Sequence, residues 1–466
     1  MSTKTTVVKW AIIASLVIVL IFFATLYNGL FNTTDAFAPV TPSGASVSAP
    51  LPTVGSSATT GATASIITKI RTQFPKNAIK NPSPLFAYAQ NIGGSNDDFV
   101  LACQSLYEYN IVFGESISDD RDICCEGKSV FAAKLNADGT LLQAYTYHAD
   151  HAAYLGHSIG ANGIYLAIGS DNTLTVVCLS SELAFLYSTE LTTDSPATEV
   201  YFRNTGSAVN VFAICNSSVN MFCLSPMLEI ECSETISSAN HLEIIEIYTF
   251  IDYFRIFLNI CAPNTFIRVV NLDFALKTIS SYDIINEFPL SLISILPVNH
   301  ADGSLSYAML VATSTGIRLN LYSTSFVCAF STYICPSKKV SLLSFGKGFL
   351  VLGKGTAAYC CMHGEIIIPE ISALTDIVSL TDYLAVDNKI LLLGKNDSGS
   401  TVIKSYSTEH TLLSNIVIAN IEPVALLSGN NSPILVLNSA YGKAPFAPCY
   451  GNFDGYVCEL KNGIIL

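Results

Sequence analysis

A short apolar strand pattern recurs eight times between residues 109 and 438, and this recurrence constrains the fold more than any other feature of the chain. The strands begin about 40 to 55 residues apart, which is the period of a four-stranded propeller blade. Their ranges are 109–114, 164–169, 209–214, 254–259, 307–312, 349–354, 389–394 and 433–438. Long amphipathic helical stretches are absent from the sequence, so the pattern predicts an all-β fold.

Each repeat divides further into four strands separated by turn residues, as in the second repeat around Asn162-Gly163 and Asp171-Asn172. Eight repeats occupy nearly all of residues 85–466, which predicts a single eight-bladed β-propeller. Seven blades are the alternative, because the last repeat is short and irregular. The segment 85–94 is a candidate for the outer strand of that last blade, which would join the two chain ends and close the ring.

The N-terminal region has a different composition. Residues 10–31 are apolar and long enough to cross a hydrocarbon core of about 30 Å, which predicts one transmembrane signal-anchor helix. Lys4 and Lys9 precede this segment and no Lys or Arg follows before Lys69, so residues 1–9 are expected in the cytoplasm and the rest outside. Residues 36–38 resemble a signal-peptidase site, but the long apolar run and Pro39 favour an uncleaved anchor. Residues 32–84 are rich in Ser, Thr, Ala, Pro and Gly and are expected to form a linker before the propeller domain at 85–466.

Charge and cysteine content narrow the choice of partners. A net charge of −13 and a pI near 4.9 disfavour nucleic acid and acidic membrane surfaces, because both select basic patches. The 14 cysteines among 466 residues are too sparse for a disulfide scaffold. Four of them lie in apolar strand-like runs and are expected in the core, namely Cys178, Cys223, Cys328 and Cys360.

The first repeat carries a family resemblance. Its segments NIGGSNDDFVLACQ, YNIVFGES and SVFAAKLNADGTLLQAY, within residues 91–147, resemble the bacterial surface-protein β-propeller repeat. Later repeats keep the spacing of the strands but lack the GGSxDD element. The resemblance implies a surface-exposed propeller, and it transfers no catalytic residue because the repeat is architectural.

Several short motifs have a simpler structural interpretation than a catalytic one. Residues 156–160 fit G-x-S-x-G and residues 353–358 fit G-x-G-x-x-A, but neither is followed by the helix that those sites require. Residues 136–139 resemble part of a calcium loop but lack its other carboxylates, so a hairpin turn is expected. Trp10 is the only tryptophan, so the docking tryptophans of quinoprotein propellers are absent despite Cys124-Cys125. We expect no cofactor, no metal ion and no catalytic residue.

Densely spaced histidines mark another candidate, because His148, Asp150, His151 and His157 fall within ten residues. We expect polar loop residues there rather than a metal site, since His157 belongs to a strand that points it elsewhere.

The lengths of the loops predict which surface of the propeller binds a partner. In a propeller the connection between the second and third strands lies on the same face as the connection to the next blade. Six of the eight second-to-third connections are tight, while those of the first and last blades are long. The loop of the first blade is mainly acidic and carries Asp119, Asp120, Arg121 and Asp122. The loop of the last blade is aromatic and carries Tyr441, Phe446, Tyr450 and Phe453. His148 and His151 are expected on the same side of the ring. Because ring closure makes these blades neighbours, we expect one composite binding patch, with Cys449 able to pair with Cys124 or Cys125.

The sequence therefore favours a membrane-anchored, extracytoplasmic interaction module whose partner is a protein, a peptide or an envelope component. An extracytoplasmic hydrolase or lyase is the alternative, with polar residues of several blades converging at the central channel.

Overall fold

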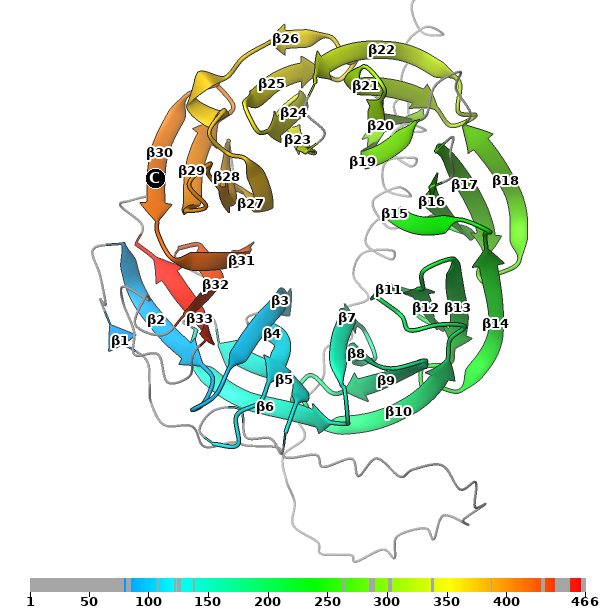
Figure 1. Cartoon of the computed structure of the whole chain (residues 1–466), viewed down its shortest axis with the longest axis vertical. Coiled ribbons are helices and arrows are strands. Elements are labelled where there is room, and N and C mark those ends of the chain that lie inside the picture. Colours follow the sequence, from blue (N-terminus) through cyan, green and yellow to red (C-terminus); the bar gives the residue numbers. More distant parts are fainter. Residues whose placement is uncertain are drawn as a thin grey trace, which may run out of the picture. The chain divides into compact units, whose positions relative to one another are not determined.

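The computed structural model describes residues 79–80, 85–106, 109–120, 123, 127–136, 139–261, 265–284, 290–300, 304–336, 339–386, 388–428, 432–440 and 453–461. These residues form eight antiparallel sheets arranged around a central axis (Figure 1). The prediction of an all-β, eight-bladed propeller is confirmed, and the seven-bladed alternative is wrong.

The first four blades follow one another along the chain. Blade 1 consists of β3 (Asp98–Leu106), β4 (Tyr109–Ser116), β5 (Ser129–Asn136) and β6 (Leu141–His148). Blade 2 consists of β7 (Ala153–Gly160), β8 (Gly163–Ser170), β9 (Thr173–Leu179) and β10 (Phe185–Thr192). Blade 3 consists of β11 (Glu199–Asn204), β12 (Val209–Ile214), β13 (Ser218–Leu224) and β14 (Ile230–Ser237). Blade 4 consists of β15 (His241–Thr249), β16 (Tyr253–Cys261), β17 (Phe266–Asp273) and β18 (Thr278–Ile284).

The next three blades repeat this arrangement. Blade 5 consists of β19 (Ser291–Asn299), β20 (Leu305–Thr313), β21 (Gly316–Ser323) and β22 (Cys328–Cys335). Blade 6 consists of β23 (Val340–Phe345), β24 (Gly348–Gly353), β25 (Thr356–Cys361) and β26 (Ile366–Ile368), followed by the short 3-10 helix η1 (Ser372–Leu374). Blade 7 consists of β27 (Ser379–Val386), β28 (Lys389–Lys395), β29 (Thr401–Ser407) and β30 (Leu412–Ile418). The recurring apolar strands recognised in the sequence are the second strands of the blades.

Blade 8 joins the two ends of the described chain. It contains β31 (Ile421–Leu427), β32 (Ile434–Ala440) and β33 (Phe453–Leu460), and its fourth strand is β2 (Phe86–Ile92) from the N-terminal side. β2 pairs antiparallel with β33, with Ala89 opposite Cys458. The outer strand predicted at residues 85–94 is therefore present. Within the predicted linker, Ile79–Lys80 form β1, which pairs with β2 at the outer edge of the same sheet.

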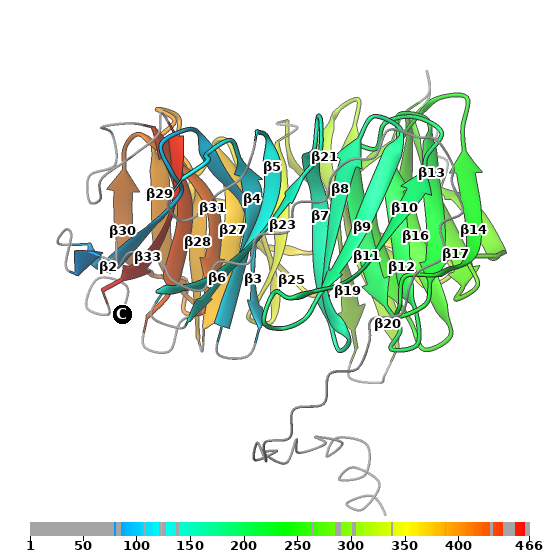
Figure 2. The same cartoon turned by 90° about the horizontal axis from the view of Figure 1, so that it is seen from below.

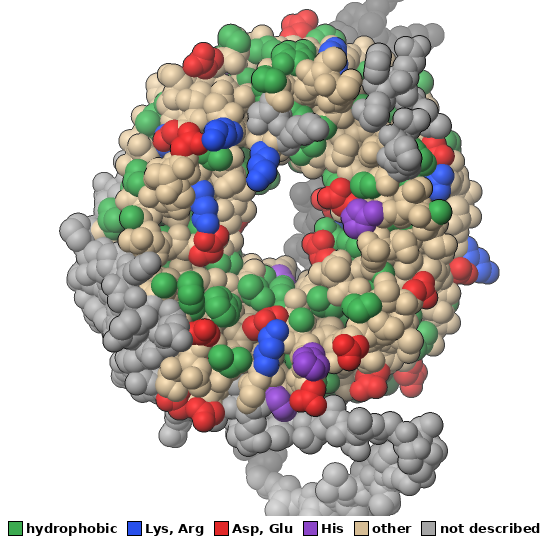
Figure 3. Space-filling view, viewed as in Figure 1, with side chains coloured by type: hydrophobic (Ala, Val, Ile, Leu, Met, Phe, Trp, Pro, Cys, Tyr) green, Lys and Arg blue, Asp and Glu red, His purple; other side chains and the backbone are tan. Residues whose placement is uncertain are grey.

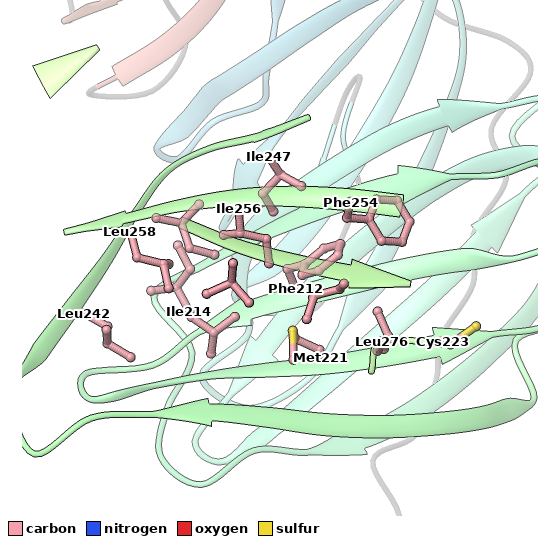
Figure 4. Close-up of a cluster of buried hydrophobic side chains, with 14 of the residues drawn as sticks. Phe212, Ile214, Met221, Cys223, Leu242, Ile247, Phe254, Ile256, Leu258 and Leu276 are labelled. Carbon is pink, nitrogen blue, oxygen red and sulfur yellow. The ribbon is translucent and has the colours of Figure 1, made fainter. Parts of the chain in front are cut away.

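The hydrophobic core lies between the blades rather than within them. Eight clusters of buried apolar side chains are present among the described residues, one in each gap between neighbouring blades. Figure 4 shows the cluster between blades 3 and 4, where Phe212 of β12 packs near Phe254 and Ile256 of β16. Because each buried aliphatic or aromatic side chain contributes about 1.5–3 kcal/mol, every gap stabilises the ring. Figure 2 shows the blades side by side, with their connections on the two faces.

Most of the inner strands contain a β-bulge. Six of the eight inner strands shift register against their second strands at a one-residue bulge, in β3, β7, β15, β19, β27 and β31. Bulges increase the local twist of a strand. On the opposite strand, Gly114 faces the bulge of β3, and a Cβ there would lie 1.9 Å from the carbonyl oxygen of Phe99. A side chain at position 114 would therefore collide with the inner strand, so this position requires glycine.

The predicted transmembrane helix at residues 10–31 and the linker upstream of residue 79 lie outside the described residues. Within the part of the chain that the structure describes, no helix has the length and apolar character needed to span a bilayer.

Candidate functional site at the junction of blades 8 and 1

The two long loops begin and end on the same face of the ring, at neighbouring blades. The β4–β5 connection covers residues 117–128 and the β32–β33 connection covers residues 441–452, whereas tight turns such as residues 171–172 and 314–315 connect the equivalent strands elsewhere. β3 of blade 1 packs against β31, β32 and β33 of blade 8. The bases of both loops therefore meet at one junction.

A polar segment between β2 and β3 holds these bases together. The backbone N–H of Ser95 donates to Asp120 Oδ1 at 2.7 Å, and that of Asn96 donates to Ser118 Oγ at 3.0 Å. On the other side, the backbone N–H of Phe453 donates to Asp97 Oδ1 at 3.1 Å. Residues 93–97, which belong to the GGSNDD motif, thus connect the acidic loop of blade 1 to the start of β33. The motif that carries the family resemblance has a structural role at ring closure.

Phe453 gives the junction an exposed aromatic side chain. It is 39% exposed, and its ring stacks on Phe99 of β3 with centroids 5.4 Å apart. An exposed aromatic ring that is already held by a neighbour loses little rotamer freedom on binding, which favours its use as a contact residue.

The predicted histidines lie at the end of β6 and in the connection from blade 1 to blade 2. His148 Nδ1 lies 3.0 Å from the carbonyl oxygen of Lys128, at the end of the long β4–β5 loop. Lys128 also forms a salt bridge of 3.0 Å with Glu115. His151 belongs to the β6–β7 connection and adopts a φ of 59°. Figure 3 shows histidine and acidic side chains gathered over blades 1 and 2 on this face.

His157 is separated from the other histidines, as the sequence predicts. It belongs to β7, its ring stacks on Phe113 with centroids 4.0 Å apart, and its Nδ1 lies 2.6 Å from the hydroxyl oxygen of Tyr154. Burial lowers the pKa of the His157 imidazole to about 4. No group of three His, Cys, Asp or Glu side chains within the described residues is arranged to hold a metal ion.

The other predicted site residues lie outside the described residues. They are Arg121, Asp122, Tyr441, Phe446 and Tyr450, together with the candidate disulfide cysteines Cys124, Cys125 and Cys449. Asp119 and Asp120 are described and belong to the base of the blade 1 loop.

Sequence reasoning missed a buried acidic group beneath this surface. Asp98 of β3, Asp454 of β33 and Asn91 of β2 are all 0% exposed. Burial raises the pKa of the Asp98 carboxyl to about 6, and the nearby Asp454 carboxylate adds to the rise. The signal in the sequence was the adjacent pair Asp97 and Asp98, which follows Gly93 and Gly94. Asp97 bonds to the base of a long loop, whereas Asp98 is buried in the core.

The structure also decides between the alternative interpretations of the short motifs. Residues 156–160 lie within strand β7, and residues 353–356 form the turn between β24 and β25. Neither motif precedes a helix, so the hairpin interpretation is confirmed. Residues 136 and 139–140 belong to the β5–β6 hairpin, where the N–H of Gly139 donates to the carbonyl of Asn136.

Cysteine placement agrees with the prediction except at one position. Cys178, Cys223 and Cys360 are buried, and none of the described cysteines forms a disulfide bond. The prediction for Cys328 was wrong, because this residue begins the outer strand β22, where one face of the sheet meets solvent.

Figure 3 shows the central opening of the ring. Charged side chains of the inner strands β11 and β15 contact one another. Arg203 pairs with Glu246 at 3.0 Å and also donates to the carbonyl oxygen of Ile247. Burial raises the pKa of Tyr201, and Glu199 adds to this effect. The paired charges connect blades 3 and 4, so their observed role is to hold neighbouring blades together.

Comparisons with known proteins identify a fold and no family. No family model matches the chain, and no curated protein matches it. Among solved structures, the Dos1 propeller has a TM-score of 0.51 and 10% identity, covering 79% of this chain and 94% of that one. The dihydro-heme d1 dehydrogenase NirN has a TM-score of 0.47 and 9% identity, covering 73% of this chain and 74% of that one. The CNH domain of AfRom2 has a TM-score of 0.40 and 11% identity, covering 66% of this chain and 94% of that one.

The chain is therefore a β-propeller. Such a ring of blades holds the loops between its strands in fixed positions.

Proposed function

We propose that the protein is an interaction module that binds a protein, a peptide or an envelope component through the junction of blades 8 and 1. We call this area the closure surface, and its described residues are 93–97, 117–120, 127–128, 148–151 and 453. The observation that supports the proposal is that residues 93–97 are hydrogen-bonded to the described base of each long loop, at Asp120 and at Phe453. Long loops on a rigid scaffold are where binding residues concentrate.

Charge and aromatic content define the chemistry of this surface. Asp119 and Asp120 supply an acidic flank and Phe453 supplies an aromatic one, and we assign Arg121, Asp122, Tyr441, Phe446 and Tyr450 to the same surface. Aromatic side chains commonly provide most of the binding energy at interfaces, while charged side chains at the rim set orientation and association rate. We also propose that Cys449 pairs with Cys124 or Cys125, which would join the two loops covalently.

The N-terminal sequence supports a membrane tether. We propose that residues 10–31 span the membrane as an uncleaved anchor, with residues 1–9 in the cytoplasm and the propeller outside. The linker would then separate the ring from the lipid headgroups by a root-mean-square distance of roughly 40 Å. The resemblance of residues 91–147 to the bacterial surface-protein repeat supports the same location, and we propose membership of that class of repeats.

A cross-linking experiment on intact cells tests both parts of the proposal. Cells producing the full chain are treated with a membrane-impermeant cross-linker, and adducts are compared between variants. The test variant combines Tyr441→Ala, Phe446→Ala, Tyr450→Ala and Phe453→Ala. The control is Phe185→Ala on the outer strand β10, because Phe185 is also 39% exposed.

Wild type and Phe185→Ala are expected to form the same adduct, and the test variant is expected to lose roughly tenfold or more of it without a lower melting temperature. Equal adduct yields from all three proteins would refute the closure surface as the binding site. Absence of any adduct, with cross-linking only after cell lysis, would refute the extracytoplasmic location.

A further inference from the structure

Cys223 of β13 and Cys232 of β14 lie directly opposite each other in the outer half of blade 3. Directly opposed residues in antiparallel strands have Cα atoms about 4.5–5.5 Å apart, and their side chains point to the same face of the sheet. That separation lies within the range of about 4.4–6.8 Å that a disulfide bond spans. Among the strand pairs that the structure describes, this is the only place where a cysteine faces a cysteine.

Packing places both cysteine side chains in the gap between blades 3 and 4. Cys223, labelled in Figure 4, belongs to the cluster of buried side chains in that gap. Cys232 is partly buried and packs against the same cluster. Burial raises the pKa of the Cys223 thiol to about 12, and the nearby Cys232 and Glu231 side chains add to the rise. The two thiols are therefore neighbours on one face of the sheet.

The hairpin between β13 and β14 keeps the two thiols opposed. The N–H of Leu228 donates to the carbonyl oxygen of Ser225 at 2.9 Å, and the Leu228 side chain is buried, so the register of the two strands is fixed. The other contacts of the thiols are weak, because a thiol is a poor hydrogen-bond donor. Cys223 Sγ lies 3.7 Å from Glu231 Oε2, and Cys232 Sγ lies 3.2 Å from the carbonyl oxygen of Ala275 in blade 4. Giving up these contacts is a small loss beside the formation of a covalent bond.

We propose that Cys223 and Cys232 form a cross-strand disulfide bond when the folded protein meets a small-molecule disulfide that acts as oxidant. Cys232 reacts first, because it belongs to the outer strand and is the more accessible of the two. Its thiolate attacks the oxidant, whose sulfur–sulfur bond breaks and releases one thiol. Cys223 then loses its proton and displaces the second thiol. The two cysteines lose two electrons in total, and the two released sulfurs gain them together with the two protons.

The bond would join the last two strands of blade 3 covalently. Disulfide oxidants are available outside the cytoplasm, so the proposed extracytoplasmic location would supply the reaction in the cell. The reaction itself depends neither on that location nor on the closure surface, because purified protein and an added oxidant are sufficient.

Peptide mapping of the full chain, purified in detergent with its thiols reduced, provides the test. The native protein is incubated with oxidised glutathione at pH 8, and the remaining thiols are then alkylated. Cleavage after glutamate separates the two cysteines, because Glu229 and Glu231 lie between them. Mass spectrometry should show that the peptides carrying residues 223 and 232 are joined in most of the protein.

Cys232→Ser should lose the joined peptides, whereas the matched control Cys215→Ser should keep them. Cys215 is also a buried cysteine of blade 3, but it has no cysteine opposite. Oxidation is expected to raise the melting temperature of wild type and of Cys215→Ser by about 2–4 °C, because the bond constrains the unfolded chain. Cys232→Ser should show no such rise.

Three results would overturn the proposal. In the first, both thiols remain open to alkylation after the native protein has been incubated with the oxidant. In the second, Cys232 carries glutathione or joins a different cysteine while Cys223 stays reduced. In the third, the bond forms only when denaturant is present, which would show that the folded hairpin does not bring the two sulfurs together.

Discussion

Asp98 and His157 are two titratable residues whose pKa values move in opposite directions. The pKa of the Asp98 carboxyl is raised from 3.8 to about 6, and the pKa of the His157 imidazole is lowered from 6.5 to about 4, in both cases mainly by burial. Folded protein therefore holds the Asp98 proton more tightly than unfolded protein does, and this stability is lost as the pH rises from about 4 to about 6. His157 has the opposite effect, because its neutral folded form loses stability as the pH falls from about 6.5 to about 4.

The two effects are similar in size, about 3 kcal/mol each, so they offset one another in wild type. We expect Asp98→Asn to leave the His157 effect uncompensated, so that its melting temperature falls more steeply than that of wild type between pH 6.5 and pH 4. His157→Gln should do the reverse and gain stability relative to wild type over the same interval. Thermal unfolding in EDTA at several pH values measures both differences. Parallel pH profiles for all three proteins would show that neither group titrates as described.

At the scale of the element, the hairpin between the third and fourth strands recurs in blades 1 to 7 with one residue in the left-handed region. That residue is glycine in blades 1 and 6 and a larger side chain elsewhere: Gly139, Leu183, Leu228, Leu276, Phe326, Gly364 and His410. A left-handed conformation costs a leucine roughly 1–2 kcal/mol. Leu183, Leu228 and Leu276 are almost fully buried against the preceding blade, and this burial offsets the cost.

Sequence reasoning predicted this hairpin only in the first blade, where Asn136 and Gly139 form a recognisable turn. A leucine in the left-handed region contradicts local propensity, since its position is set by contacts with another blade. The same limit applies at Cys328, whose apolar surroundings in sequence did not reveal that its strand lies at the outer edge.

Replacing Leu228 by glycine distinguishes the effect of side-chain burial on stability from the effect of backbone strain. We expect Leu228→Gly to destabilise the protein by about 1–3 kcal/mol, because the loss of a buried leucine exceeds the relief of strain. Asn420→Gly is the control, since Asn420 is exposed and has a φ of 63°, close to the 64° of Leu228. The control should be neutral or slightly stabilising in thermal or denaturant unfolding. A neutral Leu228→Gly would show that the hairpin residue does not anchor one blade to the next.

At the scale of the whole molecule, the repeat period predicted eight blades, with seven as the alternative, and the segment 85–94 was the candidate for the closing strand. Blades are local units, so their strands follow one another in sequence and each gap needs the same apolar pattern. The buried group of Asn91, Asp98 and Asp454 could not be predicted in this way, because Asp454 is more than 300 residues from the other two and meets them only through closure. Membrane anchoring stays a prediction from residues 10–31.

Ring closure by β2 and β33 is the central claim, because the closure surface depends on it. Ala89 and Cys458 are directly opposite each other in the paired strands, and facing residues in antiparallel strands have the Cα separation that a disulfide needs. In the variant Ala89→Cys, mild oxidation followed by proteolysis and mass spectrometry should therefore yield a peptide pair joined through residues 89 and 458. Wild type, which has Cys458 alone, provides the control. An introduced thiol at position 89 that stays free, or that joins another cysteine while Cys458 remains reduced, would contradict closure of the ring by the two chain ends.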